Sequence, residues 1–298
     1  MTLKQLLNEW SHETNFLHEV SEEERIQLHK AILDMYIDIR TLCETHNLSV
    51  MLAGGSCLGA VRHKGFIPWD DDLDLMMPRA DYNKLIDLLK GGSFSDRYQY
   101  RYPDGKKDSS STFLKVYKKG TVLKEIDTLS DSVPNELFLD FFPIESASSF
   151  FLVRKFKAFI ANGLRYISNC VCDFKRKNEV LEKAYAEKPE LQMAMKRRFF
   201  IGKCFSIIDS VKWRYWYDKF VSDCSCSQYM CIPSGRLLYE GELLPSNVYL
   251  SSIKVPFENT YAYIPKEYDR YLENLYGNYM EIPPVEKREC HFIAELKL

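Results

Sequence analysis

The chain has 298 residues, of which 46% are hydrophobic and 28% are charged, and its formal net charge is −2. These values exclude a disordered chain, and a charge so close to zero gives the whole protein no electrostatic reason to bind nucleic acid. No N-terminal stretch has the pattern of a signal peptide, and no apolar run approaches the ~20 residues of a membrane span. With nine scattered cysteines, the sequence predicts a protein of the reducing cytoplasm.

The first predicted element is a helix, because Ser21 and Glu24 fit a capping box and apolar residues then recur at helical spacing to about His46. The short apolar run SVMLAGGS, residues 49–56, predicts a strand that ends in a tight glycine turn. The segment SCLGAVRH, residues 56–63, predicts a brief helix that opens directly after this turn.

The next segment, DLDLMM at residues 72–77, alternates charged and apolar positions, which predicts a strand that Pro78 ends. A helical stripe over residues 82–89 closes at Gly91. Further along, the patterns predict strands in STFLKVYKKGTVL and ELFLDFFPI, long basic helices from about residue 150 to residue 220, and then loops with short strands and helices.

The order of these elements predicts one compact unit over residues 1–298, with an inserted or appended helical region. We divide this unit into four parts: N-terminal helices (1–47), a core (48–149), a basic helical region (150–229) and a loop-rich C-terminal part that completes the site (230–298).

The segment GFIPWDDDLDLMM, residues 65–77, places four aspartates among apolar residues. On a strand, Asp72 and Asp74 project from the same face, about 7 Å apart. Carboxylates held so close repel one another unless a cation lies between them, and hard oxygen ligands suit Mg²⁺ or Mn²⁺. Asp70 adds a candidate ligand from the preceding loop. A solvated acidic turn before a half-exposed strand is the alternative.

Two other features agree with a metal and phosphate site. Upstream, Gly54, Gly55 and Ser56 offer backbone amides and a hydroxyl to a phosphate at the start of a short helix. Downstream, Asp140 stands alone in the apolar strand FLDFFP, where burial is costly without a partner. A shared metal ion would provide that partner.

The combination of strand, glycine turn, helix and alternating aspartates resembles the nucleotidyltransferase fold of the polymerase β type, which implies an α+β protein whose core contains a mixed sheet. The segment LAGGSCLGAVRHKGFIPWDDDLDLMMPRADYNKL (52–85) is similar to the signature of the LicD family, phosphotransferases related to fukutin and fukutin-related protein. LDFFPIE (139–145) and YLENLYGNYMEIPPVEKRECH (271–291) resemble later segments of the family. Small departures are Ser56, where threonine is usual, and Glu145, where aspartate is usual.

The resemblance implies transfer of a substituted phosphate, typically phosphocholine, from a CDP-activated donor such as CDP-choline to a sugar hydroxyl. The acceptor would be a bacterial surface polysaccharide, capsule or lipopolysaccharide, or its lipid-linked precursor, and CMP would be released. By resemblance, Asp72 and Asp74 hold the metal, and Asp140 is a third ligand or the general base. A nucleotidyltransferase that releases pyrophosphate and a silent glycan-binding protein on the same fold remain alternatives.

Further candidates surround these motifs. Arg62 and Lys64, in the loop before the aspartates, are expected to bind the donor phosphates. The basic helices are expected either to be solvated faces packed on a core or to meet an anionic membrane, with the protein peripheral at its inner face. The remaining candidates for substrate binding are His63, Trp69, Lys115, Lys287, Arg288 and His291.

Overall fold

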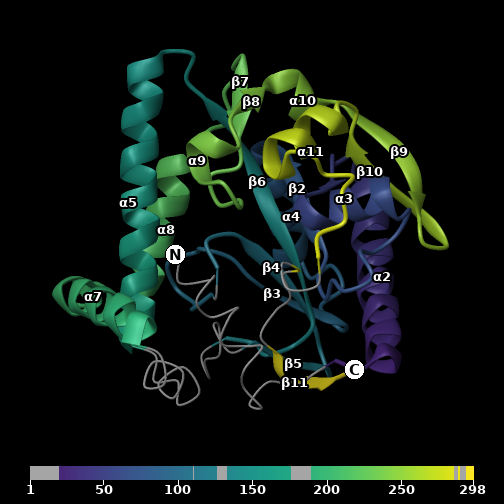
Figure 1. Cartoon of the computed structure of the whole chain (residues 1–298), viewed down its shortest axis with the longest axis horizontal. Coiled ribbons are helices and arrows are strands. Elements are labelled where there is room, and N and C mark those ends of the chain that lie inside the picture. The colour runs from purple at the N-terminus through teal and green to yellow at the C-terminus, as the bar shows by residue number, and fades with distance from the viewer. Residues whose placement is uncertain (1–19, 110, 126–132, 176–188, 285–287, 289–292) are drawn as a thin grey trace.

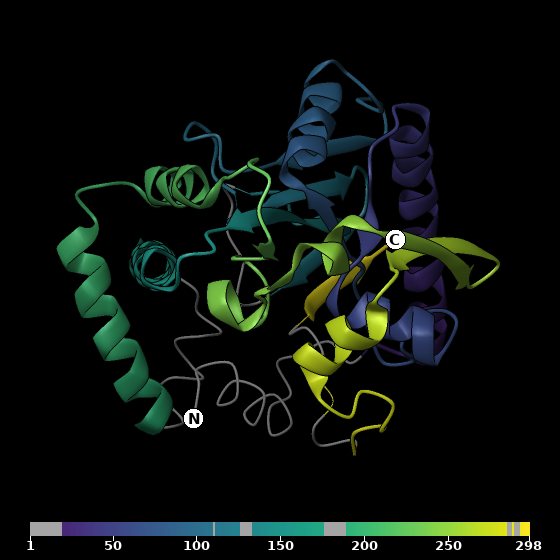
Figure 2. The same cartoon turned by 90° about the horizontal axis from the view of Figure 1, so that it is seen from above.

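The computed structural model describes residues 20–109, 111–125, 133–175, 189–284, 288 and 293–298. It is a mixed α/β structure in which a curled, mixed sheet lies between groups of helices (Figures 1 and 2). The predicted α/β composition and the mixed sheet are therefore confirmed.

The main sheet contains one parallel strand pair, β2 with β6, and its other pairs are antiparallel. In spatial order its strands are β1 (Met51–Leu52), β2 (Asp74–Pro78), β6 (Phe138–Ala147), β4 (Leu114–Lys118) and β3 (Tyr98–Arg101), with β7 (Tyr229–Cys231) on β6 and β8 (Leu244–Pro245) on β7. Two small sheets pair β5 (Val122–Glu125) with β11 (Ile293–Lys297) and β9 (Ser252–Phe257) with β10 (Thr260–Pro265).

The helices gather at two sides of the sheet: α5, α7 and α8 lie at one edge of the molecule in both views, and α2 lies at the opposite edge (Figures 1 and 2). No helix in the described part of the chain combines the length and apolar character needed to cross a bilayer. The described helices are α2 (Glu22–Thr45), α3 (Gly54–Arg62), α4 (Arg79–Lys90), α5 (Phe151–Lys175), α7 (Pro189–Phe205), α8 (Ser210–Val221), α9 (Leu238–Gly241), α10 (Ser246–Leu250) and α11 (Tyr268–Tyr276).

The capping box predicted for the first helix is confirmed. The Ser21 hydroxyl accepts from the backbone N–H of Glu24 (3.2 Å), and the Glu24 carboxylate accepts from the backbone N–H of Ser21 (2.9 Å). This reciprocal pair satisfies two donors that every helix start leaves open. The helix ends at Thr45, next to the predicted His46, and its apolar stripe is buried against the core.

Two predicted boundaries shift. Gly54 and Gly55 form the first turn of α3 instead of a turn that precedes it. Asp72 lies before β2, which begins at Asp74 and ends at the predicted Pro78. β2 therefore starts two residues later than predicted. Its partner β1 ends at Leu52, which pairs with Leu75, and the pairing of β2 with β6 begins at Asp74.

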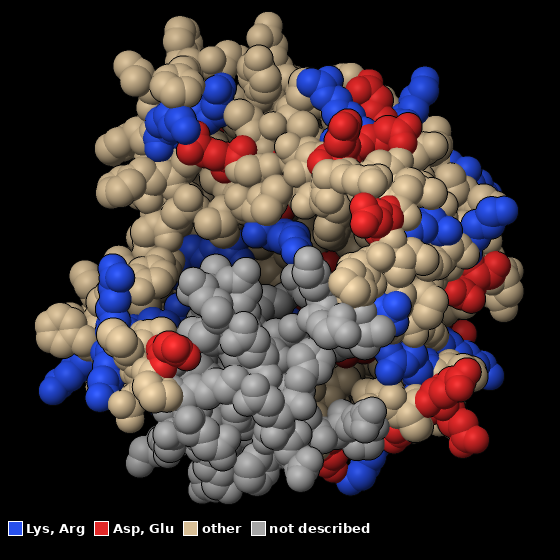
Figure 3. All heavy atoms as spheres, viewed as in Figure 1, with Lys and Arg blue, Asp and Glu red and all other residues tan. Residues whose placement is uncertain are grey.

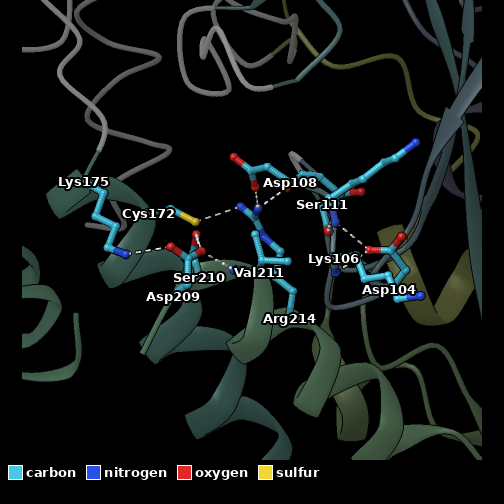
Figure 4. A network of polar contacts seen from close by, with 12 residues as sticks. Asp104, Lys106, Asp108, Ser111, Cys172, Lys175, Asp209, Ser210, Val211 and Arg214 are labelled. Atoms are coloured by element: carbon cyan, nitrogen blue, oxygen red, sulfur yellow. Dashed lines mark hydrogen bonds and ion pairs between the residues drawn. The ribbon is translucent and has the colours of Figure 1, made fainter. Parts of the chain in front are cut away.

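Buried ion pairs attach the basic helical region to the sheet. The Arg79 guanidinium at the start of α4 donates to Glu145 of β6 (2.7 Å) and to Asp218 of α8 (2.9 Å). Burial alone would lower the pKa of Arg79, but the two carboxylates outweigh it and raise that pKa. Further out, Arg214 of α8 donates to Asp108 and to the thiol sulfur of Cys172 on α5 (Figure 4). These contacts fix the helices in place because a buried charge without its partner is costly.

Candidate active site

The strand register places four charged side chains in one row across the sheet. Asp74 of β2 is in register with Asp140 of β6, Asp140 with Lys115 of β4, and Lys115 with Arg101 of β3. Residues in register on neighbouring strands project to the same face. The expectation that Asp140 lies on a strand beside the acidic segment is therefore confirmed by the backbone pairing.

Lys115 and Asp140 form a buried ion pair, with Nζ 2.9 Å from Oδ1 and only 6% and 7% of the two residues exposed. The ammonium also lies 3.4 Å from the centroid of the Phe138 ring. Burial raises the pKa of Asp140 to about 6, although the Lys115 charge opposes that shift; the charges of Glu125 and Asp72 add to it. Lys115, expected as a substrate ligand, is thus the structural partner of Asp140.

The acidic cluster lies directly against the glycine turn. Asp70, Asp71 and Asp72 each offer a carboxylate oxygen, and these oxygens lie within 4.8 Å of one another. A Cβ atom added to Gly55 would lie 3.2 Å from Oδ2 of Asp70, and one added to Gly54 would lie 3.5 Å from Oδ2 of Asp74. The backbone of α3 can approach the carboxylates this closely because both positions lack a side chain.

The start of α3 also holds the acidic strand in position. The Ser56 hydroxyl is buried and accepts from the backbone N–H of Asp74 (2.8 Å), and the backbone N–H of Ala53 donates to the Asp74 carbonyl (2.9 Å). The Gly54 N–H donates to the Tyr271 hydroxyl (3.0 Å). Gly54 and Ser56, expected to bind the donor phosphates, therefore have internal partners as well.

Trp69 brings together residues from the two ends of the chain. The guanidinium of Arg62 lies 6.0 Å from the Trp69 ring centroid, and that of Arg288 lies 4.0 Å from it. The His63 ring meets Trp69 edge to face at 6.3 Å. Burial, reinforced by the Arg62 charge, lowers the pKa of His63. Two cations thus lie over one indole ring beside the loop that carries the aspartates.

The other expected loop and C-terminal residues are placed as follows. Arg62 Nη1 also donates to the carbonyls of Tyr279 (2.9 Å) and Glu281 (3.1 Å), which attaches the loop to the C-terminal part. Lys64 is exposed at a positive φ of 58°. Lys287 and His291 lie outside the described residues.

Two residues that the sequence analysis did not select also border the site. The Tyr276 hydroxyl lies 3.6 Å from the position of a Cβ on Gly54. Burial raises the pKa of Tyr276, and the charges of Asp74 and Asp70 raise it further. His29 of α2 donates through Nε2 to the backbone carbonyl of Asp70 (2.7 Å). The sequence analysis used YLENLYG only for its family resemblance and did not single out Tyr276, and nothing in the sequence placed His29 near the aspartates.

The donor set fits a hard divalent cation. Asp70, Asp71 and Asp72 supply only carboxylate oxygens, and within the described residues they are the one group of three such ligands close enough to share an ion. Mg²⁺ and Mn²⁺ prefer oxygen ligands of this kind. Asp74 lies next to this group in sequence and borders the same glycine turn, so it could complete the set.

Comparison with known proteins points in the same direction. Residues 47–158 match the family model described as LicD/FKTN/FKRP, nucleotidyltransferase domain. The chain is 25% identical over 269 residues to lipopolysaccharide cholinephosphotransferase LicD of Haemophilus influenzae, which covers 89% of this chain and 93% of that protein. It is also 29% identical over 140 residues to protein RP689 of Rickettsia prowazekii, covering 45% of this chain and 52% of the relative.

Proposed function

Since the chain carries a LicD-family domain over residues 47–158, we propose that this protein transfers phosphocholine from CDP-choline to a sugar hydroxyl of lipopolysaccharide or its lipid-linked precursor. The similarity to a lipopolysaccharide cholinephosphotransferase supports the head group and the acceptor class. The observation that carries the proposal is the close approach of the Asp74 and Asp70 carboxylates to the Gly54–Gly55 turn, where a side chain on either glycine would meet one of them. A phosphate held by the turn would lie beside the acidic cluster.

The core would have the nucleotidyltransferase fold of the polymerase β type, within a single LicD-type unit. Mg²⁺ or Mn²⁺ would be held by Asp70, Asp71 and Asp72, with Asp74 completing the set. An ion bound there would supply positive charge that neutralises the donor diphosphate. Gly55 and the start of α3 bind the diphosphate through backbone amides, which point toward anions at a helix N-terminus.

The transfer itself is a displacement at phosphorus. The acceptor oxygen forms a bond to the choline-bearing phosphorus, the bond from that phosphorus to the bridging oxygen breaks, and CMP leaves with the bonding electron pair. Asp140 accepts the proton of the acceptor hydroxyl. Lys115 holds the Asp140 carboxylate in position, because its ammonium lies 2.9 Å from Oδ1.

The residues around Trp69 would bind the rest of the donor. Arg62, His63 and Lys64 bind the donor phosphates or the leaving CMP, and Arg288 adds a second guanidinium over the Trp69 ring. Guanidinium groups suit this role because they are always charged and pair with two phosphate oxygens at once. The protein would act at the inner face of the membrane, where a lipid-linked acceptor is presented.

The test is a panel of CDP-linked donors, with choline, ethanolamine, glycerol and ribitol head groups, incubated with the protein, Mg²⁺ and a lipopolysaccharide acceptor. We expect release of CMP with CDP-choline and at least a hundredfold loss of turnover in Asp74→Ala. The matched control is Asp87→Ala, which removes a carboxylate that is 73% exposed on α4.

Two other results would contradict the proposal. Release of pyrophosphate from a nucleoside triphosphate, with no CMP from any CDP donor, would replace the proposal by a nucleotidyltransferase. Equal turnover in Asp74→Ala and Asp87→Ala would remove the acidic cluster from the mechanism.

A further inference from the structure

The helical region at one edge of the molecule exposes an unusual amount of apolar surface. Fourteen of the twenty large hydrophobic side chains that are exposed among the described residues lie between positions 150 and 220. Single exposed apolar residues are normal on a protein surface, but a contiguous group of them marks an interaction site. The most concentrated part is the first half of α5.

The two faces of α5 are the reverse of those of an ordinary surface helix. Its outward face presents Leu152, Phe156 and Phe159, which are 78%, 67% and 75% exposed and recur at the i, i+4, i+7 spacing of one helix face. Its inward face buries mainly small residues, including Ala158 and Ala161, with Leu164 partly buried against the same cluster. A helix that only packed on a protein core would bury its large apolar side chains and expose its small ones.

Polar contacts on the inward face hold the helix in this orientation. Arg154 donates to the backbone carbonyl of Ser148 (3.1 Å), and Arg165 donates to the carbonyls of Pro233 (3.4 Å) and Gly235 (3.3 Å). Rotation of α5 to bury its phenylalanines would therefore break these hydrogen bonds. The exposed face follows from the way the helix is anchored.

Further along α5, the same outward side is covered by another helix. A Cβ atom on Gly202 of α7 would lie only 2.2 Å from the carbonyl oxygen of Cys170, so the two helices touch backbone to backbone there. Cys170 is completely buried, whereas Phe159, three turns earlier, is exposed. We define the apolar face of α5 as Leu152, Phe156, Phe159 and Tyr166.

The positive charges around this face favour an anionic partner. Among the described residues of 151–220, twelve are Lys or Arg and four are Asp or Glu. On the neighbouring α7, Lys196, Arg197 and Lys203 are exposed. Figure 3 shows uncharged side chains protruding along the edge formed by α5 and α7, with Lys and Arg atoms among them. Two copies packed through this edge would bring cations against cations, whereas an anionic surface would neutralise them.

We infer that the apolar face of α5 inserts into the interface of an anionic lipid bilayer, with the cations of α7 close to the lipid headgroups. Aromatic and leucine side chains beside Lys and Arg are the composition of helices that lie in the membrane interface without crossing it. The inference rests on the proposed function for its purpose, which is to bring the site to a lipid-linked acceptor. The docking itself requires neither donor nor acceptor.

The experiment measures cosedimentation of the full-length protein with extruded vesicles, in the absence of any CDP donor. We expect binding to vesicles of equal parts phosphatidylglycerol and phosphatidylcholine, and weaker binding to pure phosphatidylcholine. The double variant Phe156→Ser/Phe159→Ser should lower the partition coefficient at least about tenfold, because two buried rings are lost. Ile26→Ser on α2 is the matched control, since Ile26 is 64% exposed on the opposite edge and should leave binding unchanged.

A second variant separates charge from apolar insertion. Lys196→Gln/Lys203→Gln should reduce binding to the anionic vesicles roughly tenfold or more and leave the weak binding to phosphatidylcholine unchanged. CMP release with a soluble acceptor should be the same in all variants, so loss of docking and loss of catalysis are distinguishable. The inference is overturned if the wild-type protein binds neither kind of vesicle and instead forms a dimer that Phe156→Ser/Phe159→Ser dissociates. The apolar face of α5 would then bind a second copy of the chain.

Discussion

Asp74 on β2 and Asp140 on β6 are register neighbours in the one parallel strand pair of the main sheet. Their side chains therefore share a face, and Lys115, in register with Asp140 on its other side, lies 2.9 Å from the Asp140 carboxylate. The Asp140 carboxylate thus has a cationic partner within the protein, the Lys115 ammonium. Asp70, Asp71 and Asp72 lie together against the glycine turn, where a divalent ion could bind.

Removal of the Lys115 ammonium should destabilise the fold. Lys115→Met leaves the Asp140 carboxylate buried without its cation, which costs about 3 to 5 kcal/mol of unfolding free energy. Addition of Asp140→Asn to Lys115→Met should recover part of this loss. Denaturant unfolding measures both, with Lys84→Met as the control, because the Lys84 side chain is 64% exposed and its pair with Asp81 contributes under about 1 kcal/mol. Equal losses in the two lysine variants would contradict the buried pair.

Loss of the Ser56 hydroxyl should lower both the free energy of unfolding and the turnover. Ser56→Ala removes the acceptor of the Asp74 N–H in a buried environment and should cost about 1 to 3 kcal/mol of unfolding free energy. It should also lower turnover, because the start of β2 loses a contact that positions Asp74. Ser56→Thr keeps the hydroxyl and should restore both quantities. A threonine variant as weak as the alanine variant would show that the hydrogen bond is not the cause.

Gly55 should be sensitive to a single methyl group. In Gly55→Ala the new Cβ would lie 3.2 Å from Oδ2 of Asp70, so the carboxylate must move and the space for a phosphate shrinks. We expect a loss of turnover of about tenfold or more with little change in the free energy of unfolding. The matched control is Gly163→Ala on α5, where no atom lies within 4 Å of the added Cβ, and which should stabilise the helix by about 1 kcal/mol.

The buried carboxyl of Glu242 should make stability depend on pH. Burial raises the pKa of Glu242 to about 7 in the folded protein, from a value of 4.5 for an unperturbed glutamate. Between these values the unfolded state has lost the proton and the folded state keeps it, so the free energy of unfolding falls as pH rises through this window. The loss should be on the order of 3 kcal/mol and complete above about pH 7.

Thermal unfolding at about pH 4 and about pH 8 tests this prediction. Glu242→Gln keeps an oxygen that can accept from the Leu237 N–H and should remove the Glu242 share of the decrease, while the share of Asp140, whose pKa is raised to about 6, should remain. Glu273→Gln, at an exposed position on α11, should retain the wild-type pH dependence. A Glu242→Gln protein that loses as much stability as wild type over this range would show that another group is responsible.

The elements that were predicted correctly are those whose signals are local. The capping box of Ser21 and Glu24, the end of β2 at Pro78 and the end of α4 before Gly91 each depend on the conformational preferences of a few neighbouring residues. The start of β2 was predicted two residues early, at Asp72, because a strand also needs a partner and the end of β1 cannot be read from the alternating pattern.

The sequence by itself determined the chemical character of this region: clustered carboxylates at residues 70–74, beside a glycine turn and with one further carboxylate, Asp140, in a later strand. Only the tertiary structure decided that Lys115 pairs with Asp140, that Tyr276 borders Gly54, and that Arg288 meets Trp69. Those pairs join segments far apart in the chain, so no local spacing encodes them. The orientation of α5 is similar: its periodicity specifies two unlike faces, but which face turns inward depends on the carbonyls that the rest of the fold offers to its arginines.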